Sequence, residues 1–349
     1  MISPAAFDVV RCPDCAGTVT PDGAEAACRQ CRRRFDMRAG YLDLRPTESF
    51  DEQTKYLDEA LHADARHETI APPLLGSKIR HDQLRRFLAL GPGDRAIDLG
   101  CGSGRALAWN RETGATMLGV DISPFFAREA LADHDLVLGD LRRLPVRDGA
   151  FTKAWTLDVL EHLSPEALSD VLAEANRVLA PGGVLFAYSH VRRNGWPAAG
   201  VRAVNGLAHL LERVGLLDLR QERLRKSDHL NPLADHDDLA RVAGASGFRI
   251  ARMTYYTPVL GALIENVLVR IAERFLTGRA RRRLGSKDRD GTSAARSART
   301  AAKAQVRKGG AVYAGLRALS AVMALDVWLF GRFRSGPFFV LLEKVGPAE

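Results

Sequence analysis

The chain lacks the features that would carry it into or across a membrane. No apolar run reaches the ~18–20 residues of a membrane-spanning helix, which predicts that no helix spans a bilayer. The N-terminus has no basic stretch followed by an apolar one, so it lacks the pattern of a secretory signal. Cysteine is scarce, with 5 residues in 349. These absences predict a cytoplasmic protein.

Positive charge is concentrated in one stretch of the chain. The formal net charge is +8, but residues 278–308 alone contain 11 Lys or Arg and 2 Asp, a net of +9. The remainder is therefore near −1, and the basic character belongs to that stretch. The 46% hydrophobic content of the 349 residues supports a large core, enough for one sizeable domain with additions.

The most informative motif is residues 98–104, which read Asp-Leu-Gly-Cys-Gly-Ser-Gly. Its alternate glycines leave the backbone open to a ligand. Asp121 ends a second apolar run, which predicts a strand–loop–helix–strand unit with a carboxylate placed to bind ribose hydroxyls. A dinucleotide fold needs a third glycine where Arg105 stands. A doubly wound sheet that binds a different nucleotide is the alternative.

Four further motifs follow the loop in order, at 119–123, 137–141, 151–163 and 179–185. Together with the loop they resemble the class I S-adenosylmethionine-dependent methyltransferases, of the type 11-like group. The resemblance implies an α/β fold with a doubly wound, mostly parallel, seven-stranded Rossmann-like sheet. It implies that S-adenosylmethionine is bound by Asp98, Gly100, Cys101, Gly102, Gly104, Asp121, Ile122, Asp140, Leu141 and Asp158. Asp121 would then lie at the ribose and Asp140 near the adenine amino group.

Four of the five cysteines form two Cys-x-x-Cys pairs, Cys12 with Cys15 and Cys28 with Cys31. This spacing predicts a tetrahedral Zn²⁺ site of the ribbon type, and four thiolates leave no position open for water, so the metal would be structural. Disulfides are the alternative in an oxidising compartment. The fifth cysteine, Cys101, is expected to be a small buried side chain. The cysteine region resembles the zinc-ribbon head of some ribosomal-RNA guanine methyltransferases and of many bacterial methyltransferases.

Three regions are expected along the chain. A zinc-ribbon head occupies 1–45, the methyltransferase domain occupies 46–257 plus 336–349, and a helical and basic insertion occupies 258–335 between the last two strands. The expected helices are 54–69, 77–90, 105–111, 166–178 and 237–246, and the expected strands include 95–99, 184–189, 248–256 and 337–345.

Apolar stripes at helical spacing occur at 196–219, 259–276 and 312–330. Such stripes usually pack on the protein's own core. Next to a basic stretch they are also suited to peripheral contact with the inner face of an anionic membrane, here through 259–330. Nucleic-acid contact is the third alternative.

Candidates for the transfer step follow the fourth and fifth strands: Asp158, Glu161, His162 and His190, with His229 in a later turn. A hydroxyl acceptor must lose its proton, and histidine titrates in the useful range. The alternative for Glu161 and His162 is a structural one, in which they start or brace the next helix. The turn at 158–162 resembles the Glu-x-x-Glu-His turn of quinone-biosynthesis O-methyltransferases, where those side chains are implicated in divalent-metal binding. Asp158 is shorter than Glu, which argues against a metal at this turn.

Three functions are open at this point. The favoured one is methyl transfer to a small-molecule or lipid-linked acceptor, at oxygen. The zinc ribbon favours an RNA guanine methyltransferase, but the chain lacks the Pro-Pro-flanked Asn or Asp of amino-group methylases, and its basic stretch lacks interleaved aromatics. A non-catalytic binding or regulatory protein is the third, against which the intact glycine loop and Asp121 argue.

Overall fold

The computed structural model describes residues 2–47, 70–217, 219, 229–272, 274 and 310–345. The helix expected at 54–69 and the basic stretch at 279–308 lie outside these residues.

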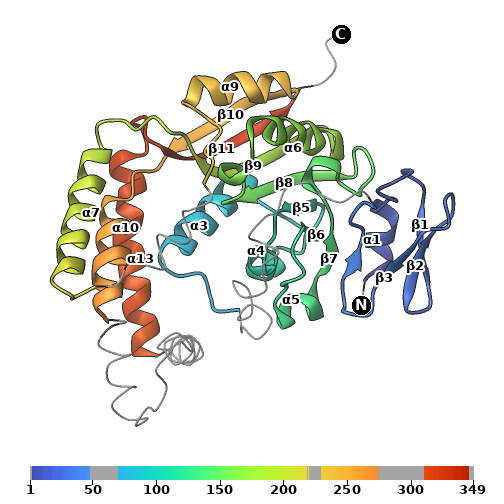
Figure 1. The fold of residues 1–349 in the computed structure, drawn as a ribbon, viewed down its shortest axis with the longest axis horizontal. Helices are drawn as coiled ribbons and strands as arrows, with labels where there is room; N and C mark the ends of the chain where they lie inside the picture. Colours follow the sequence, from blue (N-terminus) through green and yellow to red (C-terminus); the bar gives the residue numbers. More distant parts are fainter. Residues whose placement is uncertain are drawn as a thin grey trace.

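An eight-stranded sheet forms the centre of the described structure (Figure 1). Its strands lie in the order β10 (Phe248–Tyr255), β11 (Pro337–Lys344), β9 (Leu179–His190), β8 (Phe151–Leu157), β5 (Arg95–Leu99), β6 (Thr116–Asp121), β7 (Asp135–Leu138) and β4 (Leu42–Asp43). All neighbours pair in parallel except β11, which is antiparallel to both β9 and β10. The predicted doubly wound, mostly parallel sheet is confirmed, and β4 adds an eighth strand beside β7.

Helices cover both faces of the sheet (Figure 1). One face packs against α6 (Pro165–Val178) and α9 (His236–Ala245), and the other against α3 (Gly76–Leu88), α4 (Arg105–Asn110) and α5 (Arg128–Asp133). Alternate residues of a strand supply the two cores, as a pleated strand buried on both sides requires. In β11, Phe338 and Val340 belong to the first core and Phe339 to the second.

Short 3₁₀-helical turns lie in the loops between several of these strands and helices. The 3₁₀ turns are η3 (Arg111–Thr113), η4 (Leu141–Arg143) and η5 (Leu160–His162). The last of these leads into α6, which begins at Pro165 after Ser164 accepts a hydrogen bond from the backbone N–H of Ala167 (3.2 Å). This serine cap followed by proline is a typical helix start.

The N-terminal region packs against the edge of the sheet. It contains α1 (Pro4–Val9) and an antiparallel sheet of β1 (Val19–Asp22), β2 (Glu25–Cys28) and β3 (Arg34–Asp36). Ser3 donates from its backbone nitrogen and from Oγ to the carboxylate of Asp135 (2.7 and 2.6 Å). Val10, Val19 and Phe35 belong to the same apolar cluster as the first face of the sheet. The last strand of the expected head, β4, is therefore part of the central sheet.

Helices also lie between β10 and β11. These are α10 (Val259–Ala262), the π-helical η6 (Leu263–Leu268) that continues it, and α13 (Ala311–Phe330). Together with α7 (Ala198–Arg213), which follows β9, they form a layer at one end of the molecule (Figure 1).

This layer supports the start of α3. The backbone N–H groups of Leu75 and Gly76, at that start, donate to Ser320 Oγ (2.7 Å) and Glu265 Oε1 (3.0 Å). The helix has no side-chain cap of its own, so these two residues satisfy its first N–H groups.

Two sequence expectations need correction. The strand expected at 184–189 begins at Leu179, because residues 180–183 bulge out between the pairs Phe151–Leu179 and Lys153–Val184. The expectation of no membrane-spanning helix considered only uninterrupted apolar runs. By length and composition alone, the 20-residue α13 is long and apolar enough to cross a membrane. Its Arg317 and Asp326 interrupt the apolar run, and Asp326 is buried within the protein.

Candidate functional site

Five parallel strands end at one edge of the sheet, and most of the predicted site residues lie there. The glycine loop follows β5, Asp121 ends β6, Asp140 lies just beyond β7, residues 158–162 follow β8 and His190 ends β9. Ligands of open α/β sheets bind at this carboxyl edge. The edge has a cofactor half, at the ends of β5, β6 and β7, and an acceptor half, at the ends of β8 and β9.

The three glycines of the loop serve different purposes. All have positive φ: +80° at Gly100, +54° at Gly102 and +81° at Gly104. A Cβ at Gly100 would lie 2.5 Å from Val159 Cγ2, and one at Gly104 would lie 2.6 Å from Ala130 Cβ. A Cβ at Gly102 would meet no atom within 4 Å. At Gly100 and Gly104 a side chain would clash with neighbouring side chains. At Gly102 the absence of a side chain leaves the backbone exposed to open space.

Asp121 fastens the loop to the end of β6. Its Oδ2 accepts from the backbone N–H of Gly102 (2.7 Å) and its Oδ1 from that of Ser123 (2.8 Å). Burial raises the pKa of Asp121, and these two N–H donors oppose the shift. A carboxylate oxygen can accept more than one hydrogen bond, so Asp121 retains capacity for a ribose hydroxyl.

Asp98 is the strongest indication that the cofactor half is built for a ligand. It is 2% exposed, and its Oδ2 has no hydrogen-bond partner within the described part of the chain. Burial, with the neighbouring Asp121 charge, raises the pKa of Asp98 to about 8. A buried polar atom without a partner costs ~1–3 kcal/mol, and a positively charged donor beside it would lower this pKa again. The amino group of S-adenosylmethionine is such a donor, so the residues present fit this cofactor.

The remaining predicted cofactor residues have less open surroundings. Ile122 directly follows β6, and Leu141 begins the turn η4. The Asp140 carboxylate accepts from the backbone N–H of Arg142 (2.9 Å) and pairs with the Arg142 guanidinium (3.2 Å). An adenine amino group would have to share this carboxylate with Arg142.

Cys101 is a buried filler. It is 8% exposed, and its sulfur lies 2.9 Å from where a Cβ on Gly119 would be. Burial raises the pKa of the Cys101 thiol well above its ordinary value, so the reactive thiolate does not form at neutral pH.

The acceptor half contains four side chains that we name the Glu–His cluster: Glu161, His162, His190 and His229. His190 Nε2 lies 3.3 Å from His229 Nδ1, and His190 Nδ1 lies 3.9 Å from Glu161 Oε1. The rings of His162 and His229 are 4.7 Å apart between centroids and nearly perpendicular. All three histidines were expected from the sequence. His229, from a turn distant in the chain, contacts both His162 and His190.

Glu161 is the buried base of this cluster. It is 1% exposed, and its Oε2 accepts from Ser189 Oγ (2.8 Å). Burial, and then the Asp158 charge, raises the pKa of Glu161 to about 8. Glu161 therefore faces the histidines as a carboxyl that exchanges a proton near neutral pH.

Asp158 pairs with a residue that the sequence did not indicate. Its φ is +56°, and its Oδ2 lies 3.3 Å from Arg80 Nε. The guanidinium carbon of Arg80 also lies 5.4 Å from the centre of the Tyr188 ring. Arg80 lies within α3, where a polar residue is ordinary, so no sequence signal marks it. The expected catalytic role of Asp158 stays a prediction, and its observed partner is this arginine.

The Glu–His cluster also has metal-binding chemistry. One ligand atom each from Glu161, His162 and His229 lies within 4.8 Å of the others. Asp158 is not a member of this group. Nitrogen and carboxylate ligands of this kind suit several divalent metals.

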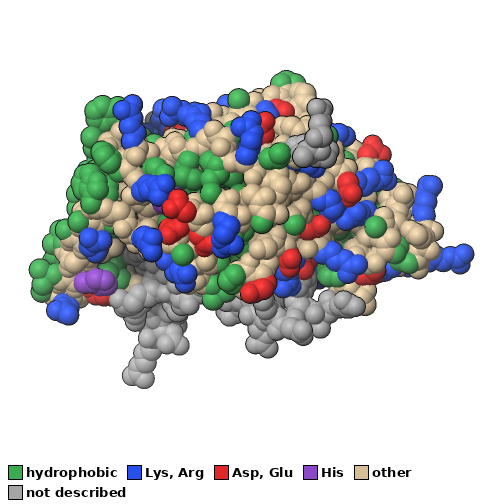
Figure 2. Space-filling view, turned by 90° about the horizontal axis from the view of Figure 1, so that it is seen from above, with side chains coloured by type: hydrophobic (Ala, Val, Ile, Leu, Met, Phe, Trp, Pro, Cys, Tyr) green, Lys and Arg blue, Asp and Glu red, His purple; other side chains and the backbone are tan. Residues whose placement is uncertain are grey.

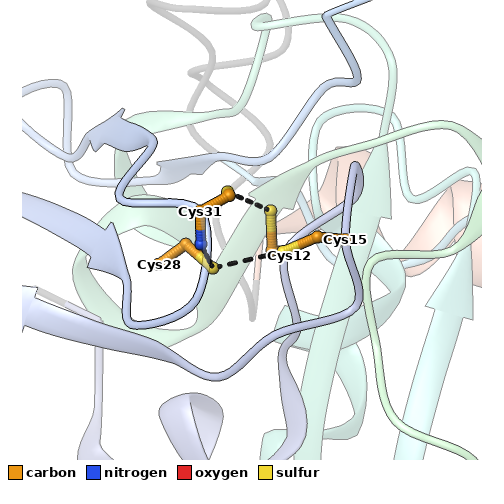
Figure 3. Close-up of side chains that lie close together, drawn as sticks. All are labelled: Cys12, Cys15, Cys28 and Cys31. Carbon is orange, nitrogen blue, oxygen red and sulfur yellow. Dashed lines mark hydrogen bonds between the residues drawn. The ribbon is translucent and has the colours of Figure 1, made fainter.

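The four N-terminal cysteines converge from two loops (Figure 3). Cys12 Sγ lies 3.7 Å from Cys31 Sγ, and Cys15 Sγ lies 3.5 Å from Cys28 Sγ. A tetrahedral Zn²⁺ with Zn–S bonds of ~2.3 Å places its sulfurs about 3.8 Å apart. All four cysteines are free, and their ligand atoms lie within 4.8 Å of one another. The group therefore fits Zn²⁺.

Backbone N–H groups favour the thiolate form of Cys28, which is the form that binds a metal. Its sulfur accepts from the N–H groups of Gln30 (3.4 Å) and Cys31 (3.5 Å). Burial opposes ionisation, but these donors prevail and lower the pKa of Cys28 to about 7. The thiolate is the metal-binding form.

Comparisons with known proteins agree with this geometry. Residues 97–187 match the family model described as "Methyltransferase domain". A protein named uncharacterized methyltransferase sll0829, from Synechocystis, is 32% identical over 35% of this chain and 59% of its own length. A malonyl-[acyl-carrier protein] O-methyltransferase from Serratia marcescens is 34% identical over 31% of this chain and 44% of its own. A 24-methylenesterol C-methyltransferase from Oryza sativa is 27% identical over 50% and 47%.

The chain thus spans about half the length of the curated relatives that it matches. The family match begins in β5 and ends in β9, and it includes the glycine loop, Asp121 and the turn at 158–162. The N-terminal cysteines and the α10–α13 layer lie outside the matched residues.

Proposed function

Because residues 97–187 match the family described as "Methyltransferase domain", we propose that this protein is a class I S-adenosylmethionine-dependent methyltransferase that transfers a methyl group to a small-molecule or lipid-linked acceptor, at an oxygen atom. The observation that carries the donor part of the proposal is the buried Asp98 Oδ2, which lacks a hydrogen-bond partner within the described residues, together with the open space at Gly102. The names of the relatives, which include an acyl-carrier O-methyltransferase and a sterol C-methyltransferase, support this class of acceptor.

The cofactor half binds the donor. Asp98, Gly102 and Asp121 would hold S-adenosylmethionine, with Asp121 at the ribose. When bound, this cofactor supplies a methyl group already activated by a positive sulfur. The hydrogen bond from the Gly102 N–H to Asp121 Oδ2 keeps the loop in position. The domain's remaining task is to place and deprotonate the acceptor.

The Glu–His cluster moves the proton. A hydrogen bond between His190 Nε2 and His229 Nδ1 needs one ring to donate and the other to accept. The pair therefore holds one proton between two nitrogens and can take a second from a hydroxyl acceptor. Glu161 lies behind His190, with 3.9 Å between Glu161 Oε1 and His190 Nδ1. This chemistry suits an oxygen acceptor, whose proton must leave.

Labelled S-adenosylmethionine distinguishes the functions. The purified protein is incubated with separate lipid, small-molecule and RNA pools. We expect label in the lipid or small-molecule pool, and a loss of roughly 10²-fold or more in rate for His190→Asn with unchanged cofactor affinity. His134→Asn is the matched control, because His134 lies between α5 and the first residue of β7, away from the carboxyl edge. Label only in RNA would establish the RNA alternative. Cofactor binding without label anywhere would favour a non-catalytic regulator.

The N-terminal cysteines are proposed to hold structural Zn²⁺. Metal analysis should find one Zn²⁺ per chain, and a chelator should destabilise the first 45 residues by several kcal/mol, measured by hydrogen exchange. Cys28→Ser should lose the metal, whereas Cys101→Ala should keep it. A metal-free wild-type protein with protected N-terminal amides would contradict this proposal.

The proposed location is the cytoplasm, with peripheral contact at the inner face of the membrane through residues 259–330. A lipid-linked acceptor would be available there. Cell fractionation tests it, and recovery from the periplasm or medium would refute it.

A further inference from the structure

The outward side of α13 has an unusual composition for a helix in contact with water. Most of its residues are exposed, and Arg317 is the one charged residue among them. The large apolar members include Val322 (41% exposed), Leu325 (46%), Trp328 (78%) and Leu329 (44%). A surface helix normally carries charged and polar residues opposite its buried stripe. This side of α13 is therefore suited to an apolar partner.

The inward side of α13 is held firmly by the protein. Ser320 Oγ accepts from the Leu75 N–H, and the Asp326 carboxylate accepts from the N–H groups of Leu260 (3.0 Å) and Gly261 (2.8 Å). Met323, between them, is fully buried. A spanning helix would lose these bonds and place Asp326 in lipid, which is costly. α13 thus presents a fixed outward face and is not arranged to cross a bilayer.

Aromatic and basic residues lie at the C-terminal end of α13. The Trp196 ring, just before α7, is 67% exposed and lies 5.2 Å from the Phe333 ring and 6.5 Å from the Phe330 ring. Exposed arginines occupy both segments, at Arg192 and Arg332. Seen from above, this end of the molecule carries hydrophobic side chains with Lys or Arg among them (Figure 2). Tryptophan and arginine are typical of the lipid–water interface.

The charge balance here favours an anionic partner. Arg193 pairs with Asp235 (2.8 Å) and Arg334 with Asp237 (3.4 Å). Arg192 and Arg332 then add positive charge that these two carboxylates do not neutralise.

We propose that this surface docks on an anionic lipid bilayer. We name it the α13 surface, and its members are Trp196, Val322, Leu325, Trp328, Leu329 and Phe333. The apolar side chains would enter the headgroup region, while Arg192 and Arg332 would pair with lipid phosphates. Exposed apolar side chains along α13, with basic residues at its C-terminal end, match an anionic membrane surface better than an ordinary protein partner.

Docking would place the acceptor half close to the lipid. β11 follows α13, and its first residue, Pro337, pairs with His190 at the end of β9. The α13 surface and the Glu–His cluster are thus joined to the same edge of the sheet. This consequence rests on the proposed function, because it matters only for a lipid-linked acceptor. Docking itself does not depend on activity.

Vesicle cosedimentation of the full chain tests the proposal. We expect binding to phosphatidylcholine vesicles that contain phosphatidylglycerol, weaker binding without it, and weaker binding at high salt. Leu325→Glu and Trp328→Glu should each reduce binding at least about tenfold. Val345→Glu is the matched control, because Val345 is 48% exposed and lies just beyond β11, at the opposite edge of the sheet. Brominated lipids should quench the wild-type tryptophan fluorescence.

Four results would overturn the proposal. The first is an absence of vesicle binding, and the second is equal binding by wild type and Leu325→Glu. The third is resistance of the membrane-bound protein to extraction at alkaline pH, which would indicate a spanning α13. The fourth is a dimer in ultracentrifugation that Leu325→Glu dissociates, without vesicle binding, which would make a second copy the occupant. Because no assay uses methyl transfer, a failure here would remove the proposed membrane contact and leave the proposed methyl transfer untouched.

Discussion

The two halves of the carboxyl edge are assembled in different ways. The cofactor half comes from one continuous segment, 98–141, and its key contact joins a backbone N–H of Gly102 to Asp121. The acceptor half is assembled from side chains distant in the sequence, such as Arg80 on α3, Glu161 after β8 and His229 in a late turn.

This difference has a functional meaning. A backbone-lined cradle suits a donor that is the same for every enzyme of its kind, because backbone groups are not altered by most substitutions. A side-chain cluster can be altered one residue at a time without disturbing the donor site. Among enzymes of this kind, we therefore expect the residues of the acceptor half and of the neighbouring helices to differ with the acceptor. We expect the residues that bind the cofactor to differ much less.

Alanine substitutions at Gly104 and Gly102 should distinguish the glycine that is needed for packing from the glycine that leaves space for the cofactor. Gly104→Ala places a Cβ 2.6 Å from Ala130 Cβ at a φ of +81°. We expect a loss of roughly 3 kcal/mol in the free energy of unfolding, from overpacking and the left-handed backbone together. Gly102→Ala meets no atom within 4 Å, so it should lose only about 1 kcal/mol of stability. Urea unfolding measures both.

The same pair should diverge in cofactor binding. Gly102→Ala should weaken S-adenosylmethionine binding in calorimetry, because its methyl group occupies the space that the cofactor needs. If Gly102→Ala bound the cofactor like the wild type, the open side of the loop would not be the binding side.

Removal of the Asp121 carboxylate tests whether the cofactor half depends on this side chain. Asp121→Ala removes the expected ribose contacts and the acceptor of the Gly102 N–H. We expect a loss of ~1.5–3 kcal/mol in cofactor binding, measured by calorimetry. Asp133→Ala, at the end of α5, serves as the control, because its carboxylate is 51% exposed. Wild-type affinity in Asp121→Ala would show that Asp121 does not hold the ribose.

Glu161, in the acceptor half, should make the free energy of unfolding depend on pH. Native Glu161 keeps its proton up to about pH 8, where burial places its pKa, whereas the ordinary value is 4.5. Between these values the native state binds more protons than the unfolded state. Stability should therefore fall as pH rises through this window, by up to about 1.4 kcal/mol per pH unit.

Glu161→Gln should flatten this slope in urea unfolding. Asp98, whose pKa burial also raises to about 8, should keep its own contribution in that variant. Asp98→Asn is thus the matched comparison from the cofactor half. Equal slopes in the wild type and Glu161→Gln would show that Glu161 is ionised at neutral pH.

Elements with strong local signals could be predicted from the sequence. β5 has the expected bounds, and α6 and β10 differ from expectation by a single residue at one end. The four cysteines also meet as their spacing predicts. The partnership of Arg80 with Asp158 could not be predicted, because it depends on how α3 packs over β8 and β9. The position of β4 at the sheet edge likewise depends on pairing with a strand far along the chain.

The sequence by itself determined the glycine loop, the succession of strands along the chain and the cysteine group, because each follows from residues that are close together in the chain. Only the tertiary structure decided which histidines meet, which glycine faces open space and which side of α13 stays exposed. Those outcomes depend on packing between elements that are distant in sequence, where neither spacing nor periodicity records the partner.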